Sequence, residues 1–385
     1  MNNGGHVIPL NHTTSVAKLS VSSVADLLTD EQELLKRELS GLFNGDTGDF
    51  DTARALTIID NLLKRFYEDK DRYRTNSWKA LDYLWNTFVN WCQNKNYTPI
   101  PASAFVVEQF FATEENKYKA NTLALFLWAI STIHRAAGVP NPTDTELAKH
   151  RLKSIRKRKV EKAEFTEQVS AFRENHLELL IGDWRNSNKS ILRRDLALLC
   201  TSYETLLRES ELTRIKFEHI TINSKGCAVI TIPVTKTNHS GNPDVVTVSP
   251  QCTHIISEYL ECVGLDFEGS NYLFKRLHAN GSLLNESFLN GLKPVKPITG
   301  KTVDYIFGKA WDHLTTTYQG LMRNVPKWSG HSARVGACQD LLQSGYNPLQ
   351  VQQAGRWSSI EMVYRYGRDI LSEESAMFRA RGHKQ

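Results

Sequence analysis

The sequence is poor in cysteine and contains no long apolar run. Its six cysteines are scattered, without a Cys-x-x-Cys pair or a Cys/His cluster at zinc spacing. No window approaches the ~18 consecutive apolar residues of a membrane span, and residues 1–10 lack the charged and apolar regions of a signal peptide. We therefore expect reduced thiols, no bound metal, no membrane partner and a cytoplasmic location.

A phosphate-binding loop is also missing. The segment TGKT at 299–302 ends like the loop of nucleotide-binding proteins, but Val295 stands where the first glycine of that pattern would be. This excludes nucleotide binding at the segment, and we expect no cofactor.

Positive charge is in modest excess and is unevenly distributed. The net charge of +5 permits binding to a polyanion without requiring it. Within the run HRLKSIRKRKVEK the only acidic residue is Glu161. Such a run is usually a solvated helix face, but its place between two apolar-periodic regions also fits a linker that follows DNA phosphates. Its basic residues are Arg151, Lys153, Arg156, Lys157, Arg158, Lys159 and Lys162.

The length of 385 residues predicts two domains, each with its own core. Apolar residues recur at helical spacing within residues 56–150, so we expect the first domain to be an all-helical DNA-binding domain. Residues 1–55 are expected to form a poorly structured or partly helical extension, and residues 151–168 a basic interdomain linker. The helical patterns lie at 56–66, 75–94, 106–111 and 122–137.

The second domain, residues 169–385, combines two kinds of pattern. The segments CAVITIPV and PDVVTVS are rich in β-branched residues and are joined by a polar turn, which predicts a β-hairpin. The other patterns are helical, so we predict a mainly α fold with a small antiparallel sheet. These helical segments lie at 195–207, 252–263, 302–315, 333–344 and 358–366.

Several polar and aromatic residues of this domain carry little information one by one. Arg208 and Glu211 are three residues apart, as in an ordinary helix-end ion pair. Lys236 lies in the turn of the predicted hairpin, where exposed lysines are common. Trp357 and Tyr366, taken singly, are interpreted most simply as core aromatics.

In chain order these residues form a specific combination. The segment WSGHSARVGA places His331 and Arg334 one helical turn apart, and Trp357 precedes Tyr366 by nine residues. The series Arg, Lys, His-x-x-Arg, Trp, Tyr resembles that of the tyrosine site-specific recombinases, the phage integrase family, and most of all their Cre-like branch. NSWKAL, LLR, TKT, GVPNP and SAM extend this resemblance from about residue 70 onward, whereas the preceding residues depart from it.

The resemblance implies a phosphoryl transfer with Tyr366 as the nucleophile. A phenol must lose its proton as it attacks phosphorus. Arg208 and Arg334 would clamp the phosphate oxygens, because guanidinium groups stay charged and bind bidentately. His331 is suited either to accept the phenolic proton or to donate a hydrogen bond to the phosphate, since the ordinary pKa of histidine lies near neutrality.

The other members of the set would assist this step. Lys236 is expected to protonate the departing 5′ hydroxyl, and Trp357 to donate its indole N–H to a phosphate oxygen. Glu211 would order the neighbourhood of Arg208 and His331. The product would be a 3′-phosphotyrosyl link that conserves the bond energy, so we expect a reaction without ATP or metal.

The resemblance also implies how DNA is bound. The two domains would form a clamp around double-stranded DNA, with first-domain helices in a major groove. Lys79 and Lys301 occupy DNA-contacting positions of the Cre-like branch, and Lys301 would reach base acceptors. The basic residues from Arg151 to Lys159 would follow the phosphates.

Assembly on the target follows from the same resemblance. Recombination would take place between lox-like sites built from inverted-repeat half-sites, with a dimer on each site and a homotetramer on two. The C-terminal segment ILSEESAMFRARGHKQ could fold onto its own domain or be exchanged between neighbouring subunits, and the resemblance favours exchange. A bacterial plasmid or phage is the expected source.

Two other functions remain open. A type IB topoisomerase uses similar residues but relaxes supercoils as a monomer; the WSGHSARVGA segment and the two-domain layout argue against it. A catalytically degenerate relative would bind specific DNA without cutting it, and the retention of every nucleophilic and cationic position disfavours it. A covalent DNA adduct would exclude the degenerate relative, and partner-dependent cleavage would exclude the topoisomerase.

Overall fold

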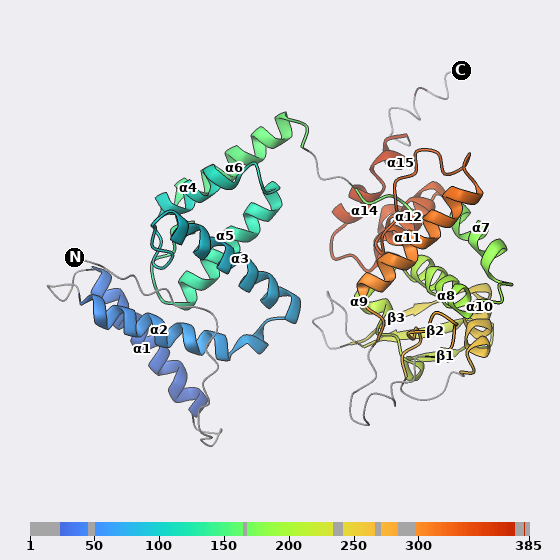
Figure 1. The fold of residues 1–385 in the computed structure, drawn as a ribbon, viewed down its shortest axis with the longest axis horizontal. Helices are drawn as coiled ribbons and strands as arrows, with labels where there is room; N and C mark the ends of the chain where they lie inside the picture. Colours follow the sequence, from blue (N-terminus) through green and yellow to red (C-terminus); the bar gives the residue numbers. More distant parts are fainter. Residues whose placement is uncertain are drawn as a thin grey trace. The chain divides into compact units, whose positions relative to one another are not determined.

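The chain divides into two compact units, Met1–Thr166 and Glu167–Gln385 (Figure 1). A computed structural model describes residues 24–44, 51–164, 168–233, 242–265, 271–283, 297–373 and 381. Within these ranges no helix combines the length and the apolar character that a membrane span needs.

The N-terminal unit is all-helical over its described residues. Polar residues cap several helix starts: Asp51 accepts a hydrogen bond from the Arg54 amide at 2.9 Å, and Ser103 accepts one from the Val106 amide at 3.3 Å. The helices are α1 (Val24–Asn44), α2 (Thr52–Glu68), α3 (Thr75–Asn94), α4 (Ala104–Glu114), α5 (Ala120–Ala136) and α6 (Glu146–Glu161), with short 3-10 turns η1 (Lys70–Arg72) and η2 (Pro142–Asp144).

An aromatic cluster holds α3, α4 and α5 together. Phe110 of α4 is fully buried and meets Phe88 and Trp91 of α3 edge-on, with ring centroids 5.3 and 5.2 Å away. On its other side Phe110 meets Phe126 of α5, with centroids 5.0 Å apart. Each such pair contributes about 0.5–1.5 kcal/mol beyond area burial. The apolar stripes of the sequence are therefore the faces at which these helices meet.

The basic run forms part of a helix in the N-terminal unit. Residues 151–161 belong to α6, whose Ala148, Leu152 and Ile155 are buried. The helix packs against α4 and α5. Three apolar residues at helical spacing thus anchor a segment whose composition is dominated by charge. The two units divide after Thr166, a point within the range 151–168 that was expected to form the linker.

The C-terminal unit is mainly helical with one small antiparallel sheet, which confirms the predicted fold class. The strand order is β1-β2-β3, and Ile230 in the central strand pairs with Ile220 and Val246. The strands are β1 (Ile220–Ile222), β2 (Ala228–Ile232) and β3 (Asp244–Thr247). The helices are α7 (Glu174–Trp184), α8 (Ser190–Thr205), α9 (Glu209–Leu212), η3 (Phe217–His219), α10 (Pro250–Cys262), α11 (Gly300–Thr317), α12 (Ser332–Gln343), α13 (Pro348–Gly355), α14 (Glu361–Tyr366) and α15 (Arg368–Glu373).

Helix α8 is the centre of the C-terminal unit. It packs against α7, α10 and α12, and residues 194–202 are buried on all faces of the helix. Its fully buried Asp195 accepts hydrogen bonds from Arg194 at 2.7 Å and from Lys309 at 2.9 Å. A buried carboxylate needs such partners. Helix α8 is therefore firmly held at the point where its C-terminal end leads to Arg208.

A second, smaller core joins α12, α13 and α14, and Figure 1 shows α12 and α14 on the side of the unit away from β1 and β2. It includes Trp357 and Tyr366. Two glycines permit the close packing: a Cβ on Gly336 would lie 1.8 Å from the Phe172 carbonyl oxygen, and one on Gly367 would lie 2.1 Å from a leucine of α12. A larger residue at Gly367 would push the end of α14 away from α12.

Candidate active site

Arg208 is fixed at the start of α9 by Glu211. Helix α8 ends at Leu206, whose φ of 51° turns the chain sharply. The Arg208 amide then donates to Glu211 Oε2 at 3.0 Å, and its Nη1 donates to Oε1 at 2.9 Å. Burial raises the pKa of the Glu211 carboxyl, but hydrogen bonds from Arg208 outweigh it and hold the pKa below its usual value. The predicted pair is thus a fixed ion pair.

Arg334 lies almost completely buried in α12. Its Nη1 donates to the Leu206 carbonyl and its Nη2 to the Gly355 carbonyl at 3.1 Å. Its guanidinium carbon lies 5.1 Å from the centroid of the Trp357 ring. Among the described residues, Arg334 Nε has no hydrogen-bond partner. One buried donor therefore remains available for an anion.

Burial makes the positive charge of Arg334 costly. It lowers the pKa of this guanidinium to about 10, and the charges of Arg208 and Arg356 lower it in the same direction. Arg334 remains protonated at neutral pH. An anionic group bound between these arginines would relieve their repulsion.

His331 and Tyr366 are in direct contact. His331 Nε2 lies 2.7 Å from the Tyr366 hydroxyl oxygen, and the Trp357 ring centroid lies 5.5 Å from that of Tyr366. Tyr366 is the last residue of α14, and its carbonyl accepts hydrogen bonds from Gln168 at 2.9 Å and Gln339 at 3.0 Å. The hydroxyl is therefore held next to the imidazole from both the side chain and the backbone.

Both members of this contact are neutral at neutral pH. Burial raises the pKa of the Tyr366 phenol, although Arg334, Arg365 and Arg208 oppose that rise. Burial also lowers the pKa of His331 to about 4, and the same three arginines lower it further. A neutral imidazole can accept a proton at Nε2 in one tautomer and donate one in the other, so both predicted roles are compatible with the geometry.

The sequence interpretation missed two arginines near this group. Arg365 precedes Tyr366 and acts electrostatically on His331. Arg356 precedes Trp357, and its Nη2 donates to the Thr205 carbonyl at 3.1 Å. Their only signal in the sequence is that each adjoins a residue of the catalytic pattern.

The remaining predicted residues have different surroundings. Lys236 lies outside the described residues. Lys301 is exposed in the first turn of α11, where a Cβ on Gly300 would lie 2.7 Å from Glu209 Oε2. The start of α11 thus contacts the residue that follows Arg208. In the N-terminal unit, Lys79 is exposed on α3.

The basic residues of α6 are of two kinds. Arg151 and Arg158 face Glu115, the residue after α4, at 3.6 and 2.6 Å, and Lys159 pairs with Glu164 at 2.6 Å. These three stabilise the N-terminal unit. Within the described part of the chain, the only ion pair of Lys157 is a long exposed contact of 3.8 Å with Glu161. Lys153 and Arg156 are exposed and make no ion pair with any described residue.

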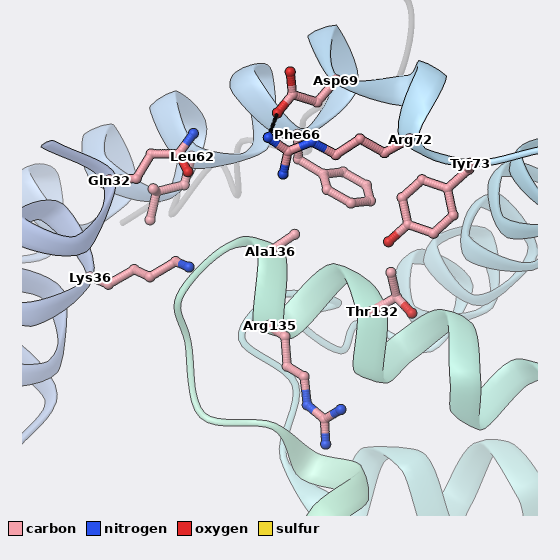
Figure 2. Close-up of a pocket in the computed structure, with 10 residues that line it drawn as sticks. All are labelled: Gln32, Lys36, Leu62, Phe66, Asp69, Arg72, Tyr73, Thr132, Arg135 and Ala136. Atoms are coloured by element: carbon pink, nitrogen blue, oxygen red, sulfur yellow. Dashed lines mark ion pairs between the residues drawn. The ribbon is translucent and has the colours of Figure 1, made fainter. Parts of the chain in front are cut away.

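The described residues contain no metal-binding cluster, and one cavity lies apart from the predicted site. Within the described ranges, no group of three or more His, Cys, Asp or Glu side chains could hold a metal ion. A cavity of about 390 Å³ lies between α1, α2 and α5, lined by Lys36, Tyr73 and Arg135, and by Arg72, which pairs with Asp69 (Figure 2). It belongs to the N-terminal unit and contains none of the predicted site residues.

Similarity to known proteins covers the same residues. The phage integrase family model matches residues 171–370. This range includes all the described residues of the predicted catalytic set, which are Arg208, Glu211, His331, Arg334, Trp357 and Tyr366. The recombinase Cre of Escherichia phage P1 is 29% identical over 320 residues, or 83% of this chain and 91% of the relative. An integrase/recombinase XerD homolog of Selenomonas ruminantium is 26% identical over 301 residues, or 76% of this chain and 81% of the relative.

Solved structures share the fold at low sequence identity. The Tn1549 transposon integrase in complex with circular intermediate DNA has a TM-score of 0.54 at 15% identity, covering 80% of this chain and 94% of that chain. XerH recombinase bound to its difH substrate has a TM-score of 0.53 at 13% identity, with coverages of 87% and 91%. Because the family match spans more than half of the sequence, the chain belongs to the phage integrase family, the tyrosine recombinases, which cleave and rejoin DNA through a phosphotyrosine intermediate.

Proposed function

We propose that this chain recombines DNA between two copies of an inverted-repeat site, with Tyr366 as the nucleophile. The observation that carries the proposal is the 2.7 Å contact between His331 Nε2 and the Tyr366 hydroxyl, beside the buried Arg334. A nucleophile within hydrogen-bond reach of a base, next to cations that can receive a phosphate, is the arrangement that phosphoryl transfer requires.

The cleavage step has a defined course of bonds and protons. The Tyr366 oxygen attacks the scissile phosphorus while its proton passes to neutral His331. The bond from phosphorus to the 5′ oxygen breaks, and that oxygen takes a proton from Lys236. A 3′-phosphotyrosyl link and a free 5′ hydroxyl result. Attack by the 5′ hydroxyl of the partner DNA reverses the step and joins the exchanged strands.

Fixed positive charge would stabilise the transition state. Arg208 and Arg334 would hold the non-bridging oxygens, and the Trp357 indole would donate to one of them. Both arginines are already oriented, by Glu211 and by backbone carbonyls, so little rearrangement accompanies the reaction. Each such donor is worth about 3–4 kcal/mol of barrier. With this charge supplied by side chains and the bond energy conserved in the phosphotyrosyl link, the reaction needs neither ATP nor metal.

DNA recognition and assembly follow the same proposal. The two units bind one half-site together as a clamp, with Lys79 and Lys301 at the DNA and Lys301 contacting a base. Two protomers occupy each lox-like site, and four assemble when two sites meet. The exchanged C-terminal segment that joins them begins at Ile370, and residues 370–373 and 381 of it are described.

A covalent adduct tests the proposal. The target site is first recovered by selecting random inverted-repeat DNA with the full chain, and a nicked copy is then incubated with protein and run on a denaturing gel. Wild type should yield a protein–DNA adduct, and Tyr366→Phe should bind the site but yield none. Tyr364→Phe is the matched control, because Tyr364 lies exposed on the same helix; it should yield a normal adduct. Specific binding without an adduct would favour a DNA-binding protein that does not cut.

A second measurement separates recombination from strand relaxation. Two marked copies of the site are placed on one supercoiled circle and the products are mapped. Exchange that requires both copies supports the recombinase, whereas relaxation of a single-site circle by isolated protomers would indicate a topoisomerase.

A further inference from the structure

Arg356 has a backbone conformation that is unusual for its residue type. It follows α13 with φ of 50° and ψ of 45°, in the left-handed region that favours glycine. This conformation is unfavourable for a residue with a side chain, because the Cβ approaches the following carbonyl oxygen. A glycine would avoid the cost, so the arginine side chain must make interactions that offset it.

Those interactions lead to the end of α8. Arg356 Nη2 donates to the Thr205 carbonyl at 3.1 Å, and Arg334 Nη1 donates to the next carbonyl, that of Leu206. Carbonyls at a helix C-terminus lack partners within the helix and carry the negative end of its dipole. Two guanidinium groups thus bind successive carbonyls immediately before Arg208.

The charges around Arg356 connect it to the same group. Glu211 and Asp244 attract its guanidinium, and Arg208 repels it. Glu211 is the carboxylate that holds Arg208, and Asp244 begins β3 directly after the hairpin turn. Arg356 therefore lies where α8, α9, α13 and the hairpin approach one another.

We propose that Arg356 is a positioning residue that holds the end of α8, and through it Arg208, in the geometry needed for phosphate binding. It acts through the Thr205 carbonyl and not on the reacting atoms. The inference rests on the proposed cleavage reaction and adds a third arginine to it. Arg334 fixes the Leu206 carbonyl and contacts the phosphate, whereas Arg356 fixes the Thr205 carbonyl, donates through Nη1 to the Ala354 carbonyl at 3.4 Å and does not contact the phosphate.

Three substitutions test this role in the full chain. Arg356→Gln removes the charge, Arg356→Lys keeps the charge but loses the planar fork, and Arg356→Gly removes the side chain while relieving the backbone. Single-turnover adduct formation on the nicked site, at saturating protein, should fall about tenfold or more in Arg356→Gln and Arg356→Gly, and less in Arg356→Lys. Affinity for the site should stay within about threefold of wild type. Arg356 affects the orientation of Arg208 in the reaction, and most of the binding energy comes from contacts elsewhere on the DNA.

Thermal stability distinguishes positioning from general support of the fold. Arg356→Gly should melt close to the wild-type temperature while cleaving slowly, since the relieved backbone compensates for the lost hydrogen bond. The matched control is Arg193→Gln, which removes an arginine that donates to the Ser187 carbonyl at 2.8 Å near the other end of α8. Its adduct rate should equal that of wild type.

A double-mutant cycle decides whether Arg356 acts through Arg208. In an Arg208→Ala background, Arg356→Gln should slow adduct formation by less than about twofold, because the group it positions is gone. An undiminished tenfold effect in that background, or a wild-type rate in Arg356→Gln alone, would overturn the inference while leaving the proposed function intact. Absence of an adduct from wild type would overturn both.

Discussion

The molecule carries two clusters of positive charge that differ in how each charge is held. In the C-terminal unit, Arg208 and Arg334 are bound to a buried carboxylate and to backbone carbonyls. On α6 of the N-terminal unit, Lys153 and Arg156 extend into solvent without a partner among the described residues. One cluster is fixed before any ligand arrives, and the other is free to adapt.

The difference corresponds to two uses of charge. Fixed donors in a buried site stabilise a developing negative charge without reorganising, and salt screens them little. Exposed cations attract the backbone of any DNA, and screening over a Debye length of about 8 Å in physiological salt weakens them. The first arrangement suits chemistry, and the second suits affinity. Substitutions in the two clusters should therefore change different measured quantities.

The largest effect is expected at Arg334. Arg334→Lys keeps a positive charge but cannot bind the Leu206 and Gly355 carbonyls together, so adduct formation should fall about 10²- to 10³-fold. Arg334→Ala should also lower the melting temperature, because two buried carbonyls lose their donors. Single-turnover cleavage and thermal melting measure the two effects. If Arg334→Lys cleaved at the wild-type rate, fixation of this charge would not matter for the chemistry.

His331 is expected to show the next largest effect. His331→Gln should slow cleavage about 10²-fold, the usual contribution of a positioned proton acceptor. The pKa of His331 is lowered to about 4, so the wild-type rate below saturation should stay flat as the pH falls through 6.5 and decline only towards 4.

The stability of the fold should follow the same shift of the His331 pKa. A lowered pKa contributes stability that is complete above 6.5 and is lost as the pH falls towards about 4. The melting temperature of His331→Gln should therefore fall less than that of wild type over this range. If the melting temperatures of the two proteins fell equally with pH, the lowered pKa of His331 would be contradicted.

The sequence predicted the elements and residues that follow local patterns. The apolar stripe at 75–94 corresponds to α3, and the hairpin corresponds to β2 and β3. Strand β1 has only three residues, too few for a period to emerge. The run at 151–162 has a charged composition that hides Leu152 and Ile155, two of the three buried residues that anchor α6.

The candidate site divides along the same lines. His331, Arg334, Trp357 and Tyr366 were selected by motif, and the structure brings them together. Arg356 could not be selected, because its role depends on a left-handed backbone and on a carbonyl 151 residues away in sequence. Neither the backbone conformation nor the contact produces a recognisable residue pattern in the sequence.

The exposed cluster should affect affinity and leave the chemistry unchanged. Replacing Lys153 and Arg156 together by glutamine should reduce the slope of log affinity against log salt by about 1.8, since each phosphate contact contributes about 0.9. Cleavage at saturating protein should stay at the wild-type rate. Filter binding over a salt series and single-turnover cleavage are the two measurements. A large loss of cleavage at saturation would place these residues in the chemical step.

Replacement of Arg158 should produce the smallest effect, and this effect should be on stability and not on cleavage or DNA affinity. Its Nη2 lies 2.6 Å from Glu115, so Arg158→Gln should lower the stability of the N-terminal unit by about 1 kcal/mol and leave the salt slope unchanged. The loss is limited because Arg151 remains 3.6 Å from the same carboxylate. Urea unfolding followed by tryptophan fluorescence measures the stability. A reduced salt slope in Arg158→Gln would show that the ion pair opens to let Arg158 bind phosphate, and the division of α6 into supporting and DNA-binding cations would then fail.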